Sequence, residues 1–135
     1  MVKLFAYGTL RPSGSLERSL LSAYSGEPLH ATAHGQLFHH VGGDNMNPIY
    51  PVADFTIMDG SIIHGDILTL DDEDWNVERT FRMEQNAGYQ LIQTEVTLDN
   101  GLTEKVYAFH FPYSQRGPRI EDGDWMPFER MELYR

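Results

Sequence analysis

Two short segments hold the residue types that could carry out chemistry, and the first is Tyr7-Gly8-Thr9-Leu10. The apolar run that precedes Gly8 is typical of a strand, and Arg11-Pro12 then takes the chain out of the sheet. In such a glycine turn the backbone N–H groups can approach a ligand closely, which suits an anionic guest. Taken alone, the tetrapeptide is more often an ordinary turn than a binding site, so it needs support from elsewhere in the chain.

The second feature is a glutamate on the face of a helix that should be buried. Residues 75–84 predict a helix on which Val77, Phe81 and Glu84 share one side, because they are spaced i, i+4 and i+7. Buried glutamates are rare unless paired, so Glu84 could simply pair with Arg82 or lie at a frayed helix end. The alternative is a general base, since desolvation and the negative end of the helix dipole would both raise the pKa of Glu84 above the usual value of about 4.3.

The remaining titratable residues predict neither a metal nor a cofactor site. The histidines most suggestive of a metal are His34, His39, His40 and His64. Neighbouring residues on a strand point to opposite faces, however, and no two histidines have the helical i, i+4 spacing. The serines lack a Gly-x-Ser-x-Gly setting, and the chain has no P-loop and no dinucleotide fingerprint.

The elements that must position these residues are mainly strands. Residues 31–38, 52–57 and 61–70 predict three neighbouring strands, and 89–98 with 103–111 predict a hairpin around Asp99-Asn100-Gly101. Residues 14–21 predict a short helix, and residues 42–48 predict a polar loop. The tail from Pro112 contains turn residues, and Trp125 is expected to pack onto the sheet as an aromatic anchor.

The boundaries of the second helix are also encoded in the sequence. Asp71-Asp72-Glu73-Asp74 predicts an N-terminal cap rather than a calcium loop, because four consecutive acids lack the spacing of calcium ligands. Gly88 predicts the end of this helix. Together these elements predict an α+β fold, in which a mixed sheet curls into a small β-barrel with flanking helices.

Composition predicts one globular domain over residues 1–135 and excludes several kinds of partner. With 41% hydrophobic and 22% charged residues, the chain lies outside the disordered class. No apolar run approaches the roughly 20 residues of a membrane span and no signal peptide is evident, so we expect a cytoplasmic protein without a membrane partner. The absence of cysteine excludes disulfides and thiolate chemistry, and the net charge of -10 argues against nucleic acid as a partner.

Four segments occur in the order seen in the γ-glutamylcyclotransferase-like (AIG2-like) family, namely 5–12, 64–67, 84–89 and 123–125. The chain resembles that family from end to end. The resemblance implies a small β-barrel with flanking helices, in which one catalytic glutamate faces a Tyr-Gly-Ser/Thr-Leu loop that holds the substrate. By resemblance Glu84 is the catalytic residue, and the substrate-binding residues are Tyr7, Gly8, Thr9, Leu10 and Tyr89. The chain departs from the family pattern near the glutamate, at Thr80-Phe81, Gln85 and Gln90.

The resemblance also implies a small-molecule γ-glutamyl substrate and a reaction that needs no cofactor and no metal. The substrate's own α-amine would attack its γ-carbonyl, close 5-oxoproline and expel the amine, while Glu84 moves the proton. Two other classes of function stay open. The chain could be a non-catalytic AIG2-like module that binds a small zwitterion, or a structural β-domain that acts through other proteins; its oligomeric state is not predicted.

Overall fold

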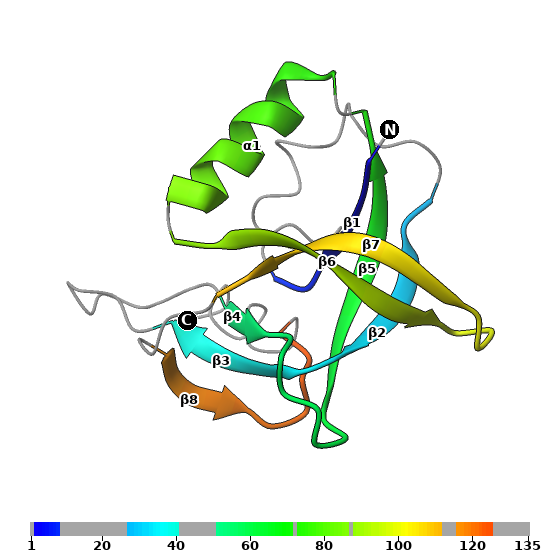
Figure 1. The fold of residues 1–135 in the computed structure, drawn as a ribbon, viewed down its shortest axis with the longest axis vertical. Coiled ribbons are helices and arrows are strands. Elements are labelled where there is room, and N and C mark those ends of the chain that lie inside the picture. The colour runs from blue at the N-terminus through cyan, green and yellow to red at the C-terminus, as the bar shows by residue number, and fades with distance from the viewer. Residues whose placement is uncertain are drawn as a thin grey trace, which may run out of the picture.

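A closed β-barrel forms the centre of the fold in the computed structural model (Figure 1). The structure describes residues 2–8, 27–40, 51–71, 73–86, 88–111 and 116–125. The barrel strands follow the order β1-β5-β2-β6-β7. Their bounds are β1 (Val2–Ala6), β2 (Leu29–His34), β5 (Ile62–Leu70), β6 (Gln90–Leu98) and β7 (Thr103–His110). All neighbours are antiparallel except β1 and β7, whose parallel pairing closes the barrel, so the predicted small mixed barrel is confirmed.

A second sheet, in the order β4-β3-β8, corrects three predictions. It consists of β3 (Gln36–His40), β4 (Pro51–Asp54) and β8 (Arg116–Ile120). Residues 31–38 were expected to form one strand, but the chain bends at Gly35, where β2 leaves the barrel and β3 begins. Gly35 has a φ of 142°, and a Cβ atom there would lie 2.5 Å from the Asp54 carbonyl oxygen, so this bend requires glycine.

The predicted strand order and tail are also corrected by this sheet. The segments expected at 52–57 and 61–70 lie in different sheets, because β4 pairs with β3 whereas β5 pairs with β1 and β2. In the tail, where turn residues were predicted, β8 pairs with β3. Figure 1 shows this three-stranded sheet at the opposite end of the molecule from the helix α1 (Trp75–Asn86).

The helix α1 begins directly after the acidic tetrad and ends before Gly88, as the sequence predicts. The Glu78 N–H donates the first backbone hydrogen bond of the helix to the Asp74 carbonyl at 3.2 Å, which places Asp74 at the N-cap position. At its end the Gly88 N–H donates to the Gln85 carbonyl and the Tyr89 N–H to the Glu84 carbonyl, both at 3.1 Å, and Gly88 has a φ of 105°. This pair of bonds is a Schellman motif, which ends the helix and fixes the chain that follows it. The helix expected at 14–21 and the loop expected at 42–48 lie outside the described residues.

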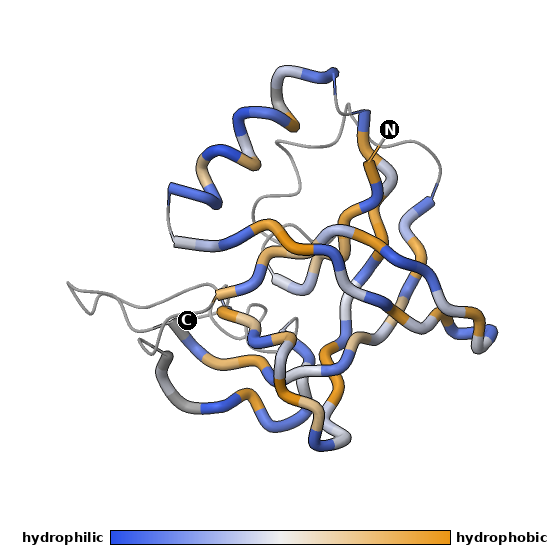
Figure 2. Tube along the Cα trace, in the orientation of Figure 1, coloured by the Kyte–Doolittle hydropathy of each residue, from blue (hydrophilic) through white to orange (hydrophobic). Residues whose placement is uncertain are grey.

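Buried side chains form two clusters on the two sides of the β1 wall. Phe5 and Tyr7 point into the first cluster, which fills the barrel and includes Trp125, only 1% exposed. The predicted aromatic anchor is thereby confirmed. Leu4 belongs to the second cluster, on the side of the barrel that α1 covers. Figure 2 shows that hydrophilic residues dominate α1, whereas hydrophobic ones recur along the barrel strands.

Candidate active site

Tyr7 lies where β1 ends, and its ring is buried in the barrel core. Its hydroxyl donates a hydrogen bond to the Phe109 carbonyl of β7. Burial raises the pKa of Tyr7 well above its ordinary value, the nearby Glu84 charge raises it further, and a hydrogen bond with the Ala53 backbone lowers it. Tyr7 is therefore a neutral, fixed phenol that is close enough to Glu84 to interact with its charge.

Glu84 is half-buried on α1, on the side of the helix where Val77 is buried. Burial raises the pKa of its carboxyl to about 7. The pairing considered from sequence does not occur, because Arg82 Nη2 binds Glu78 Oε1 at 2.7 Å instead. The helix end is not frayed either, since the Glu84 carbonyl accepts the Tyr89 N–H. The predicted helix face is confirmed, and desolvation is the cause of the raised pKa.

Gly8 and Tyr89 both contact Pro51, the first residue of β4. A Cβ atom at Gly8 would lie 2.8 Å from the Cγ and Cδ atoms of Pro51, so only glycine fits there without displacement. The Tyr89 hydroxyl donates to the Pro51 carbonyl at 2.6 Å, and the Tyr89 side chain is buried. These contacts hold the turn after β1 against the segment that follows α1. Thr9 and Leu10 lie outside the described residues.

The partners of the two tyrosines were not identified from the sequence. Tyr7 and Tyr89 bind the main-chain carbonyls of Phe109 and Pro51, and a carbonyl has no side-chain signature. His110 was also missed. It is 8% exposed, and its Nδ1 accepts a hydrogen bond from the Phe55 N–H at 3.3 Å. The alternation of the hairpin strand could have shown that His110 points away from the side occupied by Phe109.

A groove of about 570 Å³ lies beside α1. Its lining residues are Val2, Val77, Glu78, Phe81, Arg82, Gln85, Leu91 and Tyr107. Neither Tyr7, Gly8, Glu84 nor Tyr89 contributes to it.

The Glu84 carboxyl is the group of this site that is suited to proton transfer. A group with a pKa of about 7 is present in both protonation states near neutral pH, so it can accept a proton and return it. Within the described ranges no group of three or more histidine, aspartate or glutamate side chains could hold a metal ion. The helix in the described part of the chain is neither long nor apolar enough to cross a membrane.

Comparisons with known proteins identify a matching family model and several structures with the same fold. A family model described as "Gamma-glutamyl cyclotransferase, AIG2-like" matches residues 4–127. An uncharacterized protein from Pyrococcus horikoshii is 25% identical, with a TM-score of 0.68, and 99% of this chain and 97% of that chain are covered. YkqA from Bacillus subtilis is 22% identical, with a TM-score of 0.72, and 99% of this chain but 43% of that chain are covered.

A mammalian structure shares the fold as well. An AIG2-like protein from Mus musculus is 18% identical, with a TM-score of 0.66, and 84% of this chain and 80% of that chain are covered. At these identities the mouse and Bacillus structures establish the fold alone. A search of the curated proteins found no match.

Proposed function

Because the chain belongs to the gamma-glutamyl cyclotransferase, AIG2-like family, we propose that it is a cofactor-independent enzyme that forms 5-oxoproline from a γ-glutamyl amino acid or γ-glutamyl amine. The observation that carries the proposal is the Glu84 carboxyl, which burial raises to a pKa of about 7 and whose charge is close enough to Tyr7 to raise the pKa of that phenol. A carboxyl in this state is suited to general acid–base catalysis.

In the proposed reaction the substrate supplies its own nucleophile. The α-amine nitrogen attacks the γ-carbonyl carbon, a new C–N bond closes the five-membered ring, and the original amide C–N bond breaks. An α-amine with a pKa near 8 is largely protonated at neutral pH, so a base must first remove a proton. Glu84 accepts that proton, which frees the amine lone pair for attack, and then donates it to the leaving nitrogen. The ring nitrogen loses a second proton as the lactam forms, and this proton also passes to the expelled amine, which departs as an ammonium ion.

The turn that the sequence predicts at residues 7–10 is the second part of the proposed mechanism. Its backbone N–H groups would bind the substrate carboxylate or the oxyanion that forms at the γ-carbonyl. Preorganised donors of this kind contribute roughly 3–4 kcal/mol to transition-state stabilisation. The tight packing of Gly8 on Pro51 supports this role, because it fixes the start of the turn. Tyr89 supports it indirectly, since its hydroxyl holds the Pro51 carbonyl; direct contact of Tyr89 with substrate remains a prediction.

The experiment that tests the proposal is a substrate panel with matched glutamate variants. γ-Glutamyl amino acids and γ-glutamyl amines are incubated with the protein, and 5-oxoproline is measured by mass spectrometry. We expect Glu84→Gln to lower kcat/KM by roughly 10²- to 10⁴-fold, as for the loss of a general base. Glu78→Gln is the control, because Glu78 lies on the same helix with an exposed side chain paired to Arg82.

The pH dependence provides an independent measurement. The basic form of Glu84 is required, so kcat/KM should fall as the pH drops below about 7, the pKa of this carboxyl. Glu84→Gln should remove this acidic limb from any residual activity. Saturable binding of γ-glutamyl compounds without product would instead indicate a binding module, and neither binding nor product would indicate a structural domain. Turnover by Glu84→Gln at the wild-type rate would contradict the role of Glu84.

A further inference from the structure

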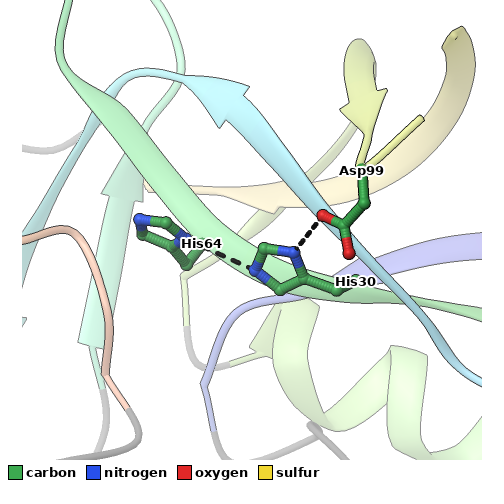
Figure 3. A network of polar contacts seen from close by, with 3 residues as sticks. All are labelled: His30, His64 and Asp99. Carbon is green, nitrogen blue, oxygen red and sulfur yellow. Dashed lines mark hydrogen bonds and ion pairs between the residues drawn. The ribbon is translucent and has the colours of Figure 1, made fainter. Parts of the chain in front are cut away.

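Two histidines and an aspartate form a second polar cluster on the outer surface of the barrel (Figure 3). His30 lies on β2, His64 on β5, and Asp99 in the turn after β6. In the register of β2 and β5, Thr32 pairs with His64 and His30 with Asp66, so the two histidines are diagonal neighbours on one face. That face points outward, because the alternate residues Ala31 and Ala33 are buried in the barrel core.

Hydrogen bonding orients the two rings relative to each other. His30 Nδ1 lies 2.7 Å from Asp99 Oδ1, and His30 Nε2 lies 3.4 Å from His64 Nδ1. The ring centroids are 5.5 Å apart with an interplanar angle of 27°. A carboxylate only accepts hydrogen bonds, so His30 donates its Nδ1 proton to Asp99. In a neutral His30 ring the lone pair is then on Nε2, the atom that a dashed line joins to His64 in Figure 3.

We propose that His30 Nε2 and His64 Nδ1 together bind one divalent transition-metal ion of the zinc class, with Asp99 as a positioning residue behind His30. Two nitrogens that lie about 2.0–2.1 Å from one tetrahedral ion are about 3.3–3.4 Å apart. The observed separation of 3.4 Å matches that spacing. The ion would take the place of the proton that the two nitrogens now share.

The contact between Asp99 and His30 is the arrangement that metal-binding histidines commonly have. Such histidines donate the second ring N–H to a carboxylate, which fixes the tautomer and makes the ligating nitrogen a better donor. Imidazole nitrogen suits zinc, copper and nickel, whereas magnesium and calcium prefer oxygen. The nitrogen ligands therefore select the zinc class of ions over the abundant hard cations.

The remaining coordination positions are open to solvent. The described residues include no group of three protein ligands for one ion, so water would complete the shell. The side chains of His30 and Asp99 are 38% and 74% exposed, and an ion can reach them from bulk water. The net charge of -10 favours the approach of a cation. These features predict an exchangeable ion rather than a permanently enclosed one.

The test is a ZnCl₂ titration of the chelator-treated, tag-free full chain, followed by long-range ¹H–¹⁵N NMR of the histidine rings. We expect saturation at one equivalent, with the resonances of His30 Nε2 and His64 Nδ1 moving toward the metal-bound range. His30→Ala and His64→Ala should each weaken zinc binding by at least about tenfold, and Asp99→Asn by about 10–100-fold. His34→Ala is the matched control, because His34 is an exposed histidine on the same strand and should leave the affinity unchanged.

Several results would overturn the proposal. These are an absence of saturable zinc binding, zinc binding that survives both His30→Ala and His64→Ala, or binding that is lost in His34→Ala. Binding through His30 Nδ1 rather than Nε2 would also contradict it. Circular dichroism checks that each variant is folded, and His30→Gln, which keeps a polar side chain at the same place, replaces His30→Ala if the latter does not fold. These measurements do not depend on turnover, so their outcome is independent of the proposed 5-oxoproline reaction.

Discussion

The protein holds its polar groups differently in two regions, an inner site and an outer cluster. The inner site consists of Tyr7, Gly8, Glu84 and Tyr89, and the outer cluster of His30, His64 and Asp99. In the inner site, burial sets the proton affinity of Glu84, and the tyrosine hydroxyls bind main-chain carbonyls of other strands. In the outer cluster, side chains bind one another on the surface, through an exposed contact of His30 with Asp99 and a part-buried contact of His30 with His64 on the neighbouring strand. Packing thus sets the proton affinity of the inner site, whereas strand register sets the geometry of the outer cluster.

The largest effect on stability should come from adding a side chain at Gly8, where Pro51 leaves no room for one. In Gly8→Ala the new methyl group meets the Pro51 ring at 2.8 Å, so we expect a loss of about 2–3 kcal/mol in the free energy of unfolding, measured in urea. The double variant Gly8→Ala/Pro51→Ala should recover much of that loss, because it removes the ring but keeps the carbonyl that binds Tyr89. An undiminished stability of Gly8→Ala would show that the turn is not tightly packed.

Removing either buried tyrosine hydroxyl should have the next largest effect. Tyr7→Phe and Tyr89→Phe each leave a carbonyl without its donor, of Phe109 or Pro51, and should cost about 1–2 kcal/mol in urea unfolding. Tyr107→Phe is the control, because Tyr107 is half-buried at the groove and its hydroxyl makes no hydrogen bond in the part of the chain that the structure describes. Equal effects in all three variants would argue that the inner hydroxyls have no special structural role.

Glu84→Gln should make the protein more stable in a pH-dependent way. The folded state binds a proton at Glu84 up to a pH of about 7, whereas the usual glutamate pKa is about 4.3, so wild-type stability falls as the pH rises from about 4.3 to 7. Glutamine has no charge to desolvate, so we expect the variant to gain roughly 3–5 °C in Tm at pH 8. The difference should vanish near pH 4, as measured by differential scanning calorimetry. A gain that is constant with pH would exclude burial of the charge as its cause.

The smallest effect on stability is expected at the outer cluster. His30→Ala and Asp99→Asn remove an exposed contact, and exposed ion pairs contribute about 0–1 kcal/mol. Without added metal, both variants should therefore unfold within about 0.5 kcal/mol of the wild type. A loss as large as that of Tyr7→Phe would mean that the outer cluster stabilises the barrel, and the contrast with the inner site would no longer hold.

Local features of the fold could be predicted from the sequence. The β6–β7 hairpin follows from its alternating pattern and from Gly101, which has a φ of 86° in the turn. The helix α1 follows from its apolar spacing and from Gly88 at its end. Within the inner site, the spacing of Val77 and Glu84 indicated a carboxyl on the buried face. Each of these patterns is contained in a short stretch of chain.

Non-local features could not be predicted in the same way. The break at Gly35 depends on the Asp54 carbonyl, which a distant strand provides. Similarly, β8 is short, and its strand character depends on pairing with β3. The contact between His30 and His64 arises from the β2–β5 register, and no spacing along one strand or helix encodes it. Sequence patterns therefore singled out the groups of the inner site, whereas in the outer cluster they indicated His64 but not its contact with His30 or the role of Asp99.

The parallel closure of the barrel by β1 and β7 affects how the protein is made. Tyr7 and its acceptor carbonyl on Phe109 are 102 positions apart in the chain. During synthesis, β1 leaves the ribosome early and must wait, unpaired with β7, until that strand has been translated. Contacts of such long range slow folding, since the loop between them must be closed first. The arrangement of Tyr7 is thus completed late, and a nascent chain that stops before residue 109 would contain the glutamate and the tyrosine without the closed wall that holds the tyrosine.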